Sequence, residues 1–477
     1  MSWIARWETI FHICLSGLTL MAYSVESVPE IFWTAIAPCT LLILLTWGAL
    51  ELYKTDPLYL LTAGFWFRIA AAFFFGLGGL WRVLATETTL TYVLTFFNPS
   101  QDEMNKAQTV VTVSICIIIA VSNLVEGSRR KATTSNLIPV EAEKWLPTFT
   151  YGCLLIGIPA LVYFTMQTLL GFEAETNGFS ALGNLAYLGI FLAVYAGFRG
   201  KKMMLLLGIA GTVLLVLHGA LLATKQYMLL PLIMAAIAHL LCRPKLRNAV
   251  LWAAGIGLTY ALSAPYVAYT RTEAFQRYGM LTPTLAVRLQ LIDNYLAGDR
   301  GDFAAGDDYQ PWLARISYLP SQAFAVASYD AGRRGTSVDL ALYVLVPRLL
   351  MPDKPDFLPG VDYSVAALAN GDSQSNPSLV AEGYYVGGWP GVIFWMSLYG
   401  AEIGLYSREA IRRLRAGDML FLPVILIALQ VGQGAADWIV GVILGSGVFI
   451  AFAYAASWVA HCALKYLWSE TKRLAAT

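Results

Sequence analysis

Residues 347–391 read PRLLMPDKPDFLPGVDYSVAALANGDSQSNPSLVAEGYYVGGWPG. The stretch holds seven charged residues and three tyrosines, although the sequence on either side of it is mostly apolar. Prolines and glycines recur along it, so it cannot form one regular helix. Charged residues in an irregular segment of an otherwise apolar chain typically have a function. We therefore expect the functional site within residues 347–391.

The composition places the chain among membrane proteins. Hydrophobic residues make up 57% of its 477 residues and charged residues 13%, whereas about 25% of the residues of a soluble domain are charged. We therefore predict an all-α protein that crosses the membrane several times. The net charge of +1 gives no general attraction for nucleic acid, and no nucleic-acid partner is expected.

The cysteines and histidines form no recognisable disulfide or metal motif. The six cysteines are scattered without a CxxC spacing, and nearly all lie in apolar runs, as buried thiols do. The four histidines are also far apart in the sequence, which favours single packed side chains over a metal site. The first apolar run is not followed by a cleavage site of the A-x-A type, so we expect a retained first span.

Twelve apolar segments are candidates for crossing a bilayer, which requires about 20 residues. They lie near residues 8–24, 31–51, 60–84, 107–125, 148–169, 181–198, 203–222, 227–242, 249–267, 388–406, 418–434 and 438–460. The sequence therefore predicts about twelve transmembrane helices.

Lysines and arginines cluster in alternate connections between these segments. One set of connections carries most of them, including the run Arg129-Arg130-Lys131, whereas the other short connections carry Lys106 and Lys225. The positive-inside rule then predicts that both termini are cytoplasmic and that residues 268–387 lie outside. The predicted organisation is a nine-helix part (1–267), a large periplasmic loop (268–387) and a three-helix part with a cytoplasmic tail (388–477).

The large loop is predicted to be folded. Residues 283–296 and 312–329 have apolar faces at helical spacing, with Pro320 as the expected kink of the second helix. The sequence GRRG at 332–335 predicts a turn, and residues 337–350 predict a short apolar element. Arg315 would then lie on the second helix, and Arg348 would emerge at the membrane surface.

Two basic residues outside the large loop have open roles. Arg68 lies well inside the third predicted span, where a charge must face the bundle interior or a wet cavity. It could form a structural ion pair or contact a polar ligand. Lys225 lies in an outer turn, where it could be an interfacial lysine or a phosphate contact.

Several local patterns resemble the Wzy-type polysaccharide polymerases, which are the O-antigen and repeat-unit polymerases of the bacterial inner membrane. Residues 224–226 read TKQ where the family often has a basic residue, and 313–317 read LARIS, like its arginine-bearing loop helix. Residues 346–355 read VPRLLMPDKP, which looks very like its proline-arginine…proline-aspartate-lysine-proline signature. Residues 376–391 read NPSLVAEGYYVGGWPG, similar to its segment leading back into the membrane.

This resemblance implies a helical fold related to other lipid-linked sugar transferases, which is a GT-C-like fold, and a glycosyltransferase activity. The implied substrate is an oligosaccharide repeat unit carried on undecaprenyl diphosphate. The growing glycan would pass from its lipid diphosphate to a sugar hydroxyl of the next unit at the periplasmic face. The lipid bilayer, a flippase and a chain-length-regulating copolymerase are the other expected partners.

The chemistry of such a transfer sets the expected roles. A diphosphate leaving group needs its charge neutralised, which arginine and lysine can do without a metal. We expect Arg315 and Arg348 to act there and Glu382 to be the base that activates the hydroxyl, with Asp353 and Asp356 as alternative bases. The expected diphosphate- and sugar-binding residues are Lys354, Lys225, Asp353, Arg271, Tyr384, Tyr385 and Arg68.

These residues also have structural alternatives. Asp353 and Lys354 could pair and tie down the loop. Glu382 could cap the start of the tenth span, and the tyrosines could belong to an interfacial aromatic belt.

Two other functions share some of these features. An O-antigen ligase performs the same chemistry with a different acceptor. A lipid-linked oligosaccharide flippase would place its charges inside the bundle at mid-membrane, whereas this chain concentrates them in one outer loop.

Overall fold

The computed structural model describes residues 3–25, 28–127, 146–169, 179–278, 283–299, 309–339, 341–346, 351, 353, 359–368 and 375–459, the last range without 449, 452 and 456. Within these ranges the regular structure is helical and no strand occurs. Eight helices there are long and apolar enough to cross a membrane. The prediction of a polytopic all-α membrane protein is confirmed at this level.

The helices follow the predicted spans. The eight candidate spans are Phe32–Thr55, Ala63–Leu84, Gln101–Glu126, Leu146–Gln167, Lys202–Leu221, Lys225–Cys242, Leu246–Tyr278 and Val440–Val459. Helices also cover the other four predicted ranges, at Trp3–Tyr23, Phe179–Phe198, Leu379–Arg415 and Leu422–Gln433.

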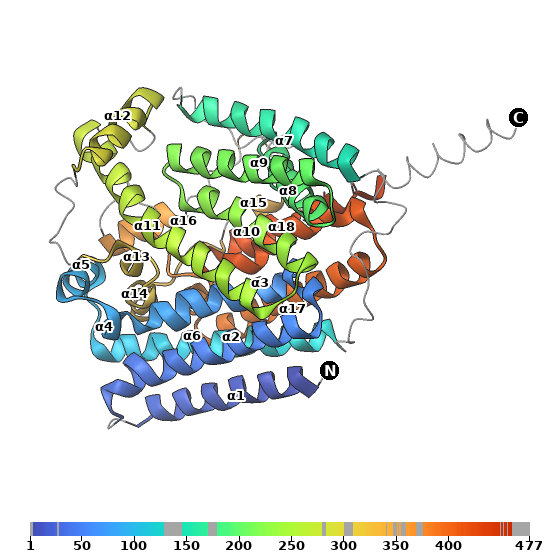
Figure 1. The fold of residues 1–477 in the computed structure, drawn as a ribbon. Helices are drawn as coiled ribbons and strands as arrows, with labels where there is room; N and C mark the ends of the chain where they lie inside the picture. Colours follow the sequence, from blue (N-terminus) through green and yellow to red (C-terminus); the bar gives the residue numbers. More distant parts are fainter. Residues whose placement is uncertain are drawn as a thin grey trace, which may run out of the picture. The chain divides into compact units, whose positions relative to one another are not determined.

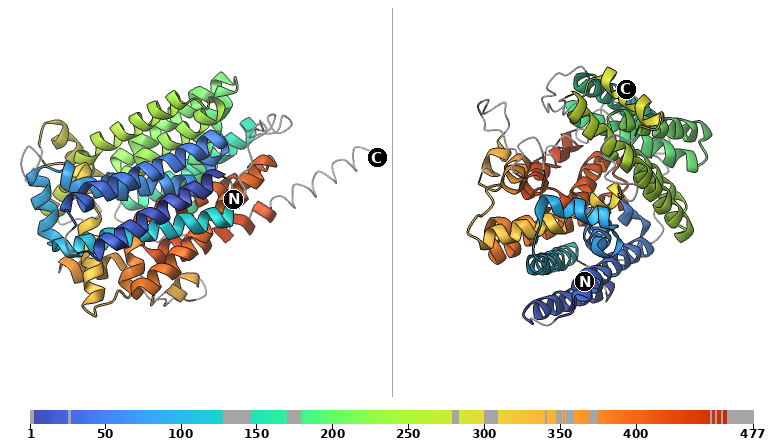
Figure 2. Two further views of the ribbon diagram at one scale, coloured as in Figure 1. Left: turned by 90° about the horizontal axis from the view of Figure 1, so that it is seen from below. Right: turned by 90° about the vertical axis from the view of Figure 1, so that its left-hand side faces the viewer.

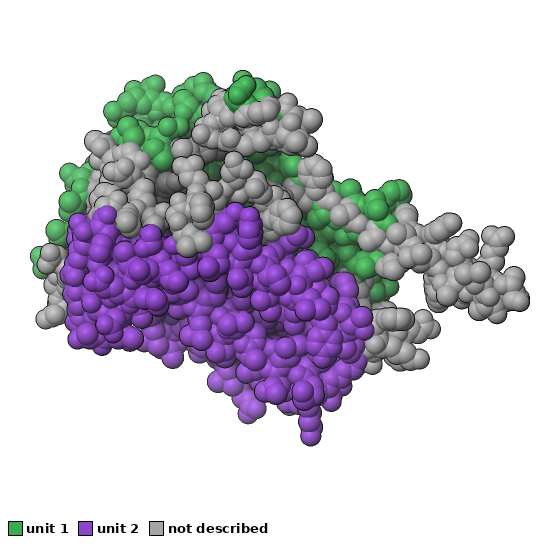
Figure 3. Space-filling model, turned by 90° about the horizontal axis from the view of Figure 1, so that it is seen from above, with its two compact units in different colours: residues 1–135, 313–477 green, residues 136–312 purple. Residues whose placement is uncertain are grey.

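The chain divides into two compact units, residues 1–135 with 313–477 (unit 1) and residues 136–312 (unit 2), which are coloured separately in Figure 3. The boundary between them falls inside the predicted loop 268–387. The first part of this loop therefore belongs to unit 2 and the second part to unit 1.

Unit 1 is built from two stretches of chain. Its elements are α1 (Trp3–Tyr23), η1 (Phe32–Ile36), α2 (Ala37–Thr55), η2 (Pro57–Leu61), α3 (Ala63–Ala71), η3 (Ala72–Leu77), η4 (Gly78–Leu80), α4 (Trp81–Leu84), α5 (Glu87–Phe97), α6 (Gln101–Glu126), α14 (Leu319–Asp330), α15 (Ala341–Leu345), α16 (Pro359–Leu368), α17 (Leu379–Arg415), η6 (Met419–Phe421), α18 (Leu422–Gln433), η7 (Gly434–Ala436) and η8 (Val440–Gly445). Helices α1, α2 and α6 run side by side (Figures 1 and 2).

Helix α6 is a central element of unit 1, because α1, α14 and α17 all pack against it. Its close contact with α17 depends on two glycines. A Cβ atom on Gly400 would lie 2.8 Å from the carbonyl oxygen of Ile118, and one on Gly404 would lie 2.7 Å from that of Ser122. Such small residues let two helix backbones approach closely, as is common between transmembrane helices.

Helix α17 consists of two limbs that fold back on each other at Gly388. This glycine has φ 60° and ψ −151°, which is not helical. The fold-back places Gly391 so that a Cβ atom on it would lie 2.3 Å from the carbonyl oxygen of Gly383, eight residues earlier. We call residues 379–387 the first limb and residues 389–415 the second limb.

The first limb lies inside the helical bundle of unit 1. The hydroxyl of Ser114, near the middle of α6, donates a hydrogen bond to the carbonyl oxygen of Val380 at 2.8 Å. This contact places residues 379–387, which belong to the predicted outer loop, beside a candidate span.

Unit 2 contains six further helices. They are α7 (Leu146–Leu169), α8 (Phe179–Phe198), α9 (Lys202–Leu221), α10 (Lys225–Cys242), α11 (Leu246–Tyr278) and α12 (Leu285–Leu296), and the short α13 (Pro311–Ala314) crosses the boundary between the units. Helix α8 packs against α7, α9 and α10, and α11 packs against α10 and α12. Close backbone approaches occur at Gly157 against Ala186 and at Gly208 against Val194.

The loop elements were predicted with mixed success. The helix expected at 283–296 is present as α12, and a short apolar helix, α15, lies within 337–350. The prediction of a single kinked helix at 312–329 is wrong, because α13 ends at Ala314 and α14 begins at Leu319. Pro320 lies in the first turn of α14, where proline needs no hydrogen-bond partner and therefore causes no kink.

Candidate functional site

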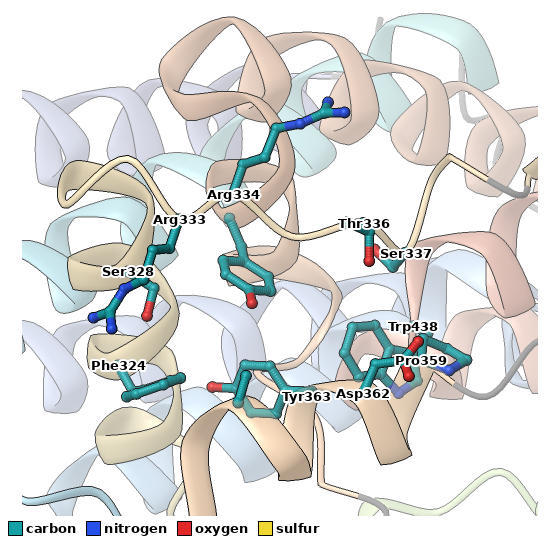
Figure 4. Close-up of a pocket in the computed structure, with 12 residues that line it drawn as sticks. Phe324, Ser328, Arg333, Arg334, Thr336, Ser337, Pro359, Asp362, Tyr363 and Trp438 are labelled. Carbon is teal, nitrogen blue, oxygen red and sulfur yellow. The ribbon is translucent and has the colours of Figure 1, made fainter.

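A pocket of about 250 Å³ lies in unit 1 (Figure 4). Its lining comes from α14, the segment that follows α14, α16, the first limb of α17 and the turn before the last helix. The lining residues are Phe324, Ser328, Arg333, Arg334, Thr336, Ser337, Pro359, Asp362, Tyr363, Ala366, Tyr385 and Trp438. All but one of them come from the predicted outer loop.

One side of the pocket is an aromatic cluster centred on Tyr363 of α16. Its ring meets the rings of Phe324, Tyr385 and Trp438 edge to face, with centroids 5.7–5.8 Å apart. The Tyr363 hydroxyl donates a hydrogen bond to the carbonyl oxygen of Ser321 at 2.6 Å. Because buried tyrosine needs such a partner, this bond ties α16 to α14 and fixes the ring.

Two arginines follow the end of α14. Gly332 has φ 78°, a left-handed conformation that ends the helix. Gly335 packs so closely under Tyr385 that a Cβ atom would lie 2.4 Å from the ring. The expected turn at GRRG is therefore present, and it presents Arg333 and Arg334 at the pocket.

The two arginines differ in direction and in pairing. Arg334 is 3.2 Å from Asp339, and Figure 4 shows it extending away from the aromatic rings. Arg333 is directed toward Ser328 and Phe324 (Figure 4), and it forms no ion pair with any residue that the structure describes. Burial raises the pKa of Tyr385, and the positive charge of Arg333 partly offsets this effect.

The remaining polar groups of the pocket include a carboxylate and three aliphatic hydroxyls. Asp362 lies in the first turn of α16 and is exposed. The hydroxyls belong to Ser328, Thr336 and Ser337. Cations, hydroxyls and aromatic faces in one pocket can bind a phosphorylated sugar, because arginine pairs with phosphate oxygens.

Glu382, the predicted base, lies directly behind this pocket and is fully buried. One carboxylate oxygen accepts a hydrogen bond from the hydroxyl of Ser337, and the other accepts one from the backbone N–H of Ile439 at 2.5 Å. Glu382 therefore caps the helical segment Val440–Val459, not the tenth predicted span. Its burial also means that it cannot touch a substrate in the pocket directly.

Arg315 was predicted to lie on a helix beside the diphosphate. It lies in the turn between α13 and α14, is exposed, and is not among the residues that line the pocket. Asp353 is likewise exposed and outside the lining. Arg348, Lys354 and Asp356 lie outside the described residues.

Tyr384 belongs to a polar contact between three helices. Its hydroxyl donates to the carboxylate of Asp330 at 2.9 Å, and the same carboxylate pairs with Lys106 of α6 at 2.5 Å. The ring of Tyr384 lies edge on to Trp389, with centroids 5.5 Å apart. These contacts favour a positioning role for Tyr384, whereas its neighbour Tyr385 lines the pocket.

Lys225 and Arg271 belong to unit 2, whereas the pocket belongs to unit 1. The ammonium group of Lys225, at the start of α10, lies 4.7 Å from the ring centroid of Tyr260. Arg271 is exposed on α11. Neither residue is among those that line the pocket.

Arg68 forms a buried network and is itself fully buried. Its guanidinium contacts both carboxylate oxygens of Glu8, at 2.5 and 2.9 Å, and the side-chain oxygen of Asn123 at 3.0 Å. It also donates to the carbonyl oxygen of Gly64 at 2.7 Å. Two roles were considered for Arg68, and this geometry supports the structural ion pair.

Sequence reasoning missed several residues of the pocket. Arg333 was expected in the GRRG turn but was not among the predicted site residues, and Ser337 and Trp438 were given no role. The GRRG turn was a usable signal, because its glycines fix where the arginines point. Trp438 lies far from the loop in sequence, so only the fold reveals it.

Within the ranges that the structure describes, no group of three or more histidine, cysteine, aspartate or glutamate side chains could hold a metal ion. Comparisons of the chain with protein-family models, with curated proteins and with solved structures found no match.

Proposed function

We propose that this protein is a membrane glycosyltransferase that polymerises oligosaccharide repeat units carried on undecaprenyl diphosphate. The observation that supports this most is the pocket, whose lining combines Arg333 with the aromatic rings of Tyr385 and Tyr363. An anion and a sugar are the two chemical groups of a lipid-linked diphosphate sugar that such a lining can recognise. The resemblance of the sequence to Wzy-type polymerases supports the same reaction.

The proposed reaction displaces the lipid diphosphate from a sugar C1 carbon by a hydroxyl of the acceptor unit. Arg333, helped by Arg334, neutralises the negative charge that develops on the leaving diphosphate. The aromatic rings contact the C–H faces of the sugars. Neutralisation by arginine lets the reaction proceed without a metal cofactor, as expected from the sequence.

The proposed setting is the bacterial inner membrane with about twelve spans and both termini in the cytoplasm. The distribution of lysine and arginine supports this orientation, which places the pocket at the periplasmic face. The donor would then arrive from a flippase in the same membrane. A copolymerase that regulates chain length is a further proposed partner.

The network around Arg68 bears on the flippase alternative. A flippase needs intramembrane charges that are available to its cargo. Arg68 is the charged residue that the sequence places deepest in a span, and its guanidinium is engaged with Glu8 and Asn123. A transferase therefore accounts better for the charges in and around the pocket.

Replacing Arg333 with alanine is expected to lower the rate of polymer formation about 100-fold, because one charge-stabilising donor typically contributes that much. The measurement uses purified protein in nanodiscs with undecaprenyl-diphosphate-linked repeat units from its own cell envelope. No nucleotide sugar or metal is added, and the length of the products is read on a gel.

Arg412 provides the matched control for this experiment. It is exposed in the last turn of α17 and pairs with Glu409, which Arg413 also contacts. The Arg412→Ala variant should polymerise at the wild-type rate. Transport of the lipid by wild-type protein in proteoliposomes without any product would overturn the transferase, and transfer only to a different acceptor would assign a ligase.

A further inference from the structure

We propose that Ser337 relays a proton from the acceptor sugar to Glu382, so that Glu382 acts as a base without touching the substrate. This inference rests on the proposed transferase function and assigns its proton pathway. Ser337 lines the pocket, and its hydroxyl donates a hydrogen bond to the buried carboxylate of Glu382. The two residues therefore connect the pocket with a carboxylate that lies behind its wall.

The position of Ser337 follows from the local fold. Gly335 donates its backbone N–H to the carbonyl oxygen of Tyr385 at 2.9 Å, which fastens the segment after α14 to the first limb of α17. Ser337 follows two residues later and is 7% exposed. Glu382 lies on the same limb as Tyr385. This backbone hydrogen bond therefore positions both the Ser337 hydroxyl and the Glu382 carboxylate.

The surroundings of Glu382 suit a base. Burial raises the pKa of its carboxyl group, which lies on the non-spanning first limb, to about 8. The hydrogen bonds from Ser337 and from the N–H of Ile439 act in the opposite direction, since they favour the charged form. A base whose pKa lies near the working pH combines a useful ionised fraction with a strong pull on the proton.

The proton transfer balances as follows. The acceptor hydroxyl loses its proton to the Ser337 oxygen while its own oxygen forms the new bond to the donor C1 carbon. At the same time the Ser337 proton passes to a carboxylate oxygen of Glu382. The bond between C1 and the diphosphate oxygen breaks, and its electron pair leaves with the diphosphate.

Other charged and titratable groups surround this pair without contacting the carboxylate. Among the described residues, no ion pair or hydrogen bond joins any of them to Glu382. These charged and titratable groups are Lys106 on α6, Asp330 on α14, Arg333 and Arg334 after α14, Asp362 and Tyr363 on α16, and Asp437 before the helical segment Val440–Val459.

Two variants of Ser337 test the relay. Ser337→Ala removes the hydroxyl and is expected to lower kcat about 100-fold, the lower range for general-base catalysis, with KM nearly unchanged. Ser337→Thr keeps the hydroxyl and should restore most of the rate. Unfolding of each variant in mild detergent is measured alongside, because loss of a purely structural hydrogen bond would lower stability without this difference in kcat.

The dependence of kcat/KM on pH tests the relay independently. For wild-type protein, kcat/KM should rise with pH as Glu382 ionises and level off above about pH 8, and the residual rate of Ser337→Ala should lose this rise. A wild-type rate in Ser337→Ala would overturn the relay while leaving the transferase intact. Absence of polymer from wild-type protein would instead overturn the proposed function itself.

Discussion

Replacing Glu8 with alanine is expected to destabilise the folded protein by about 3–5 kcal/mol, which is the usual cost of removing one partner of a buried ion pair. The cost is high because Arg68 would keep its charge while fully buried. Its guanidinium would retain only the carbonyl oxygen of Gly64 and the side chain of Asn123. Asn123 would also lose the Glu8 oxygen to which its amide donates.

The measurement is thermal or denaturant unfolding of the protein in mild detergent. Glu51→Ala is the matched control, because Glu51 of α2 is partly exposed and pairs with the exposed Lys54 at 2.9 Å. Exposed pairs contribute about 0–1 kcal/mol, so this variant should unfold like wild type. Equal stability of the Glu8→Ala and control variants would show that Arg68 is not held by Glu8.

The sequence predicted the class of fold because apolar run length is a strong constraint. A span needs about 20 apolar residues, and eight helices among the described residues are long and apolar enough to cross a membrane. The same reasoning required a partner for Arg68. It could not name Glu8, which lies 60 residues away, because the pairing depends on how α1 and α3 pack.

The candidate site was predicted less well, and the reasons are specific. The sequence drew attention to the residues around Glu382, which adjoin the pocket, but a sequence cannot tell a helix that packs within a bundle from a loop outside it. The first limb is short, and its direction is set by one backbone conformation at Gly388. Ser337 and Trp438 approach Glu382 only because that limb folds back.

Replacing Gly388 with alanine is expected to destabilise unit 1 by several kcal/mol and to abolish polymer formation. With φ 60° and ψ −151°, Gly388 occupies a region of backbone conformation that is essentially restricted to glycine, at a cost of about 1–3 kcal/mol for other residues. A Cβ atom would also lie 2.8 Å from the ring of Tyr329. The first limb, which carries Glu382 and Tyr385, would have to move.

Gly387, the residue before Gly388, provides the control for this prediction. It has neither a positive φ nor a neighbour within 4 Å of the position of a Cβ atom. Gly387→Ala should therefore leave stability unchanged or raise it by about 0.5–1 kcal/mol, since alanine is a better helix former than glycine. Unfolding and polymer-formation assays on the Gly388→Ala and Gly387→Ala variants test whether the fold-back depends on the conformation of Gly388. If both behave alike, the fold-back does not depend on the conformation of Gly388, and Glu382 needs another explanation for its place behind the pocket.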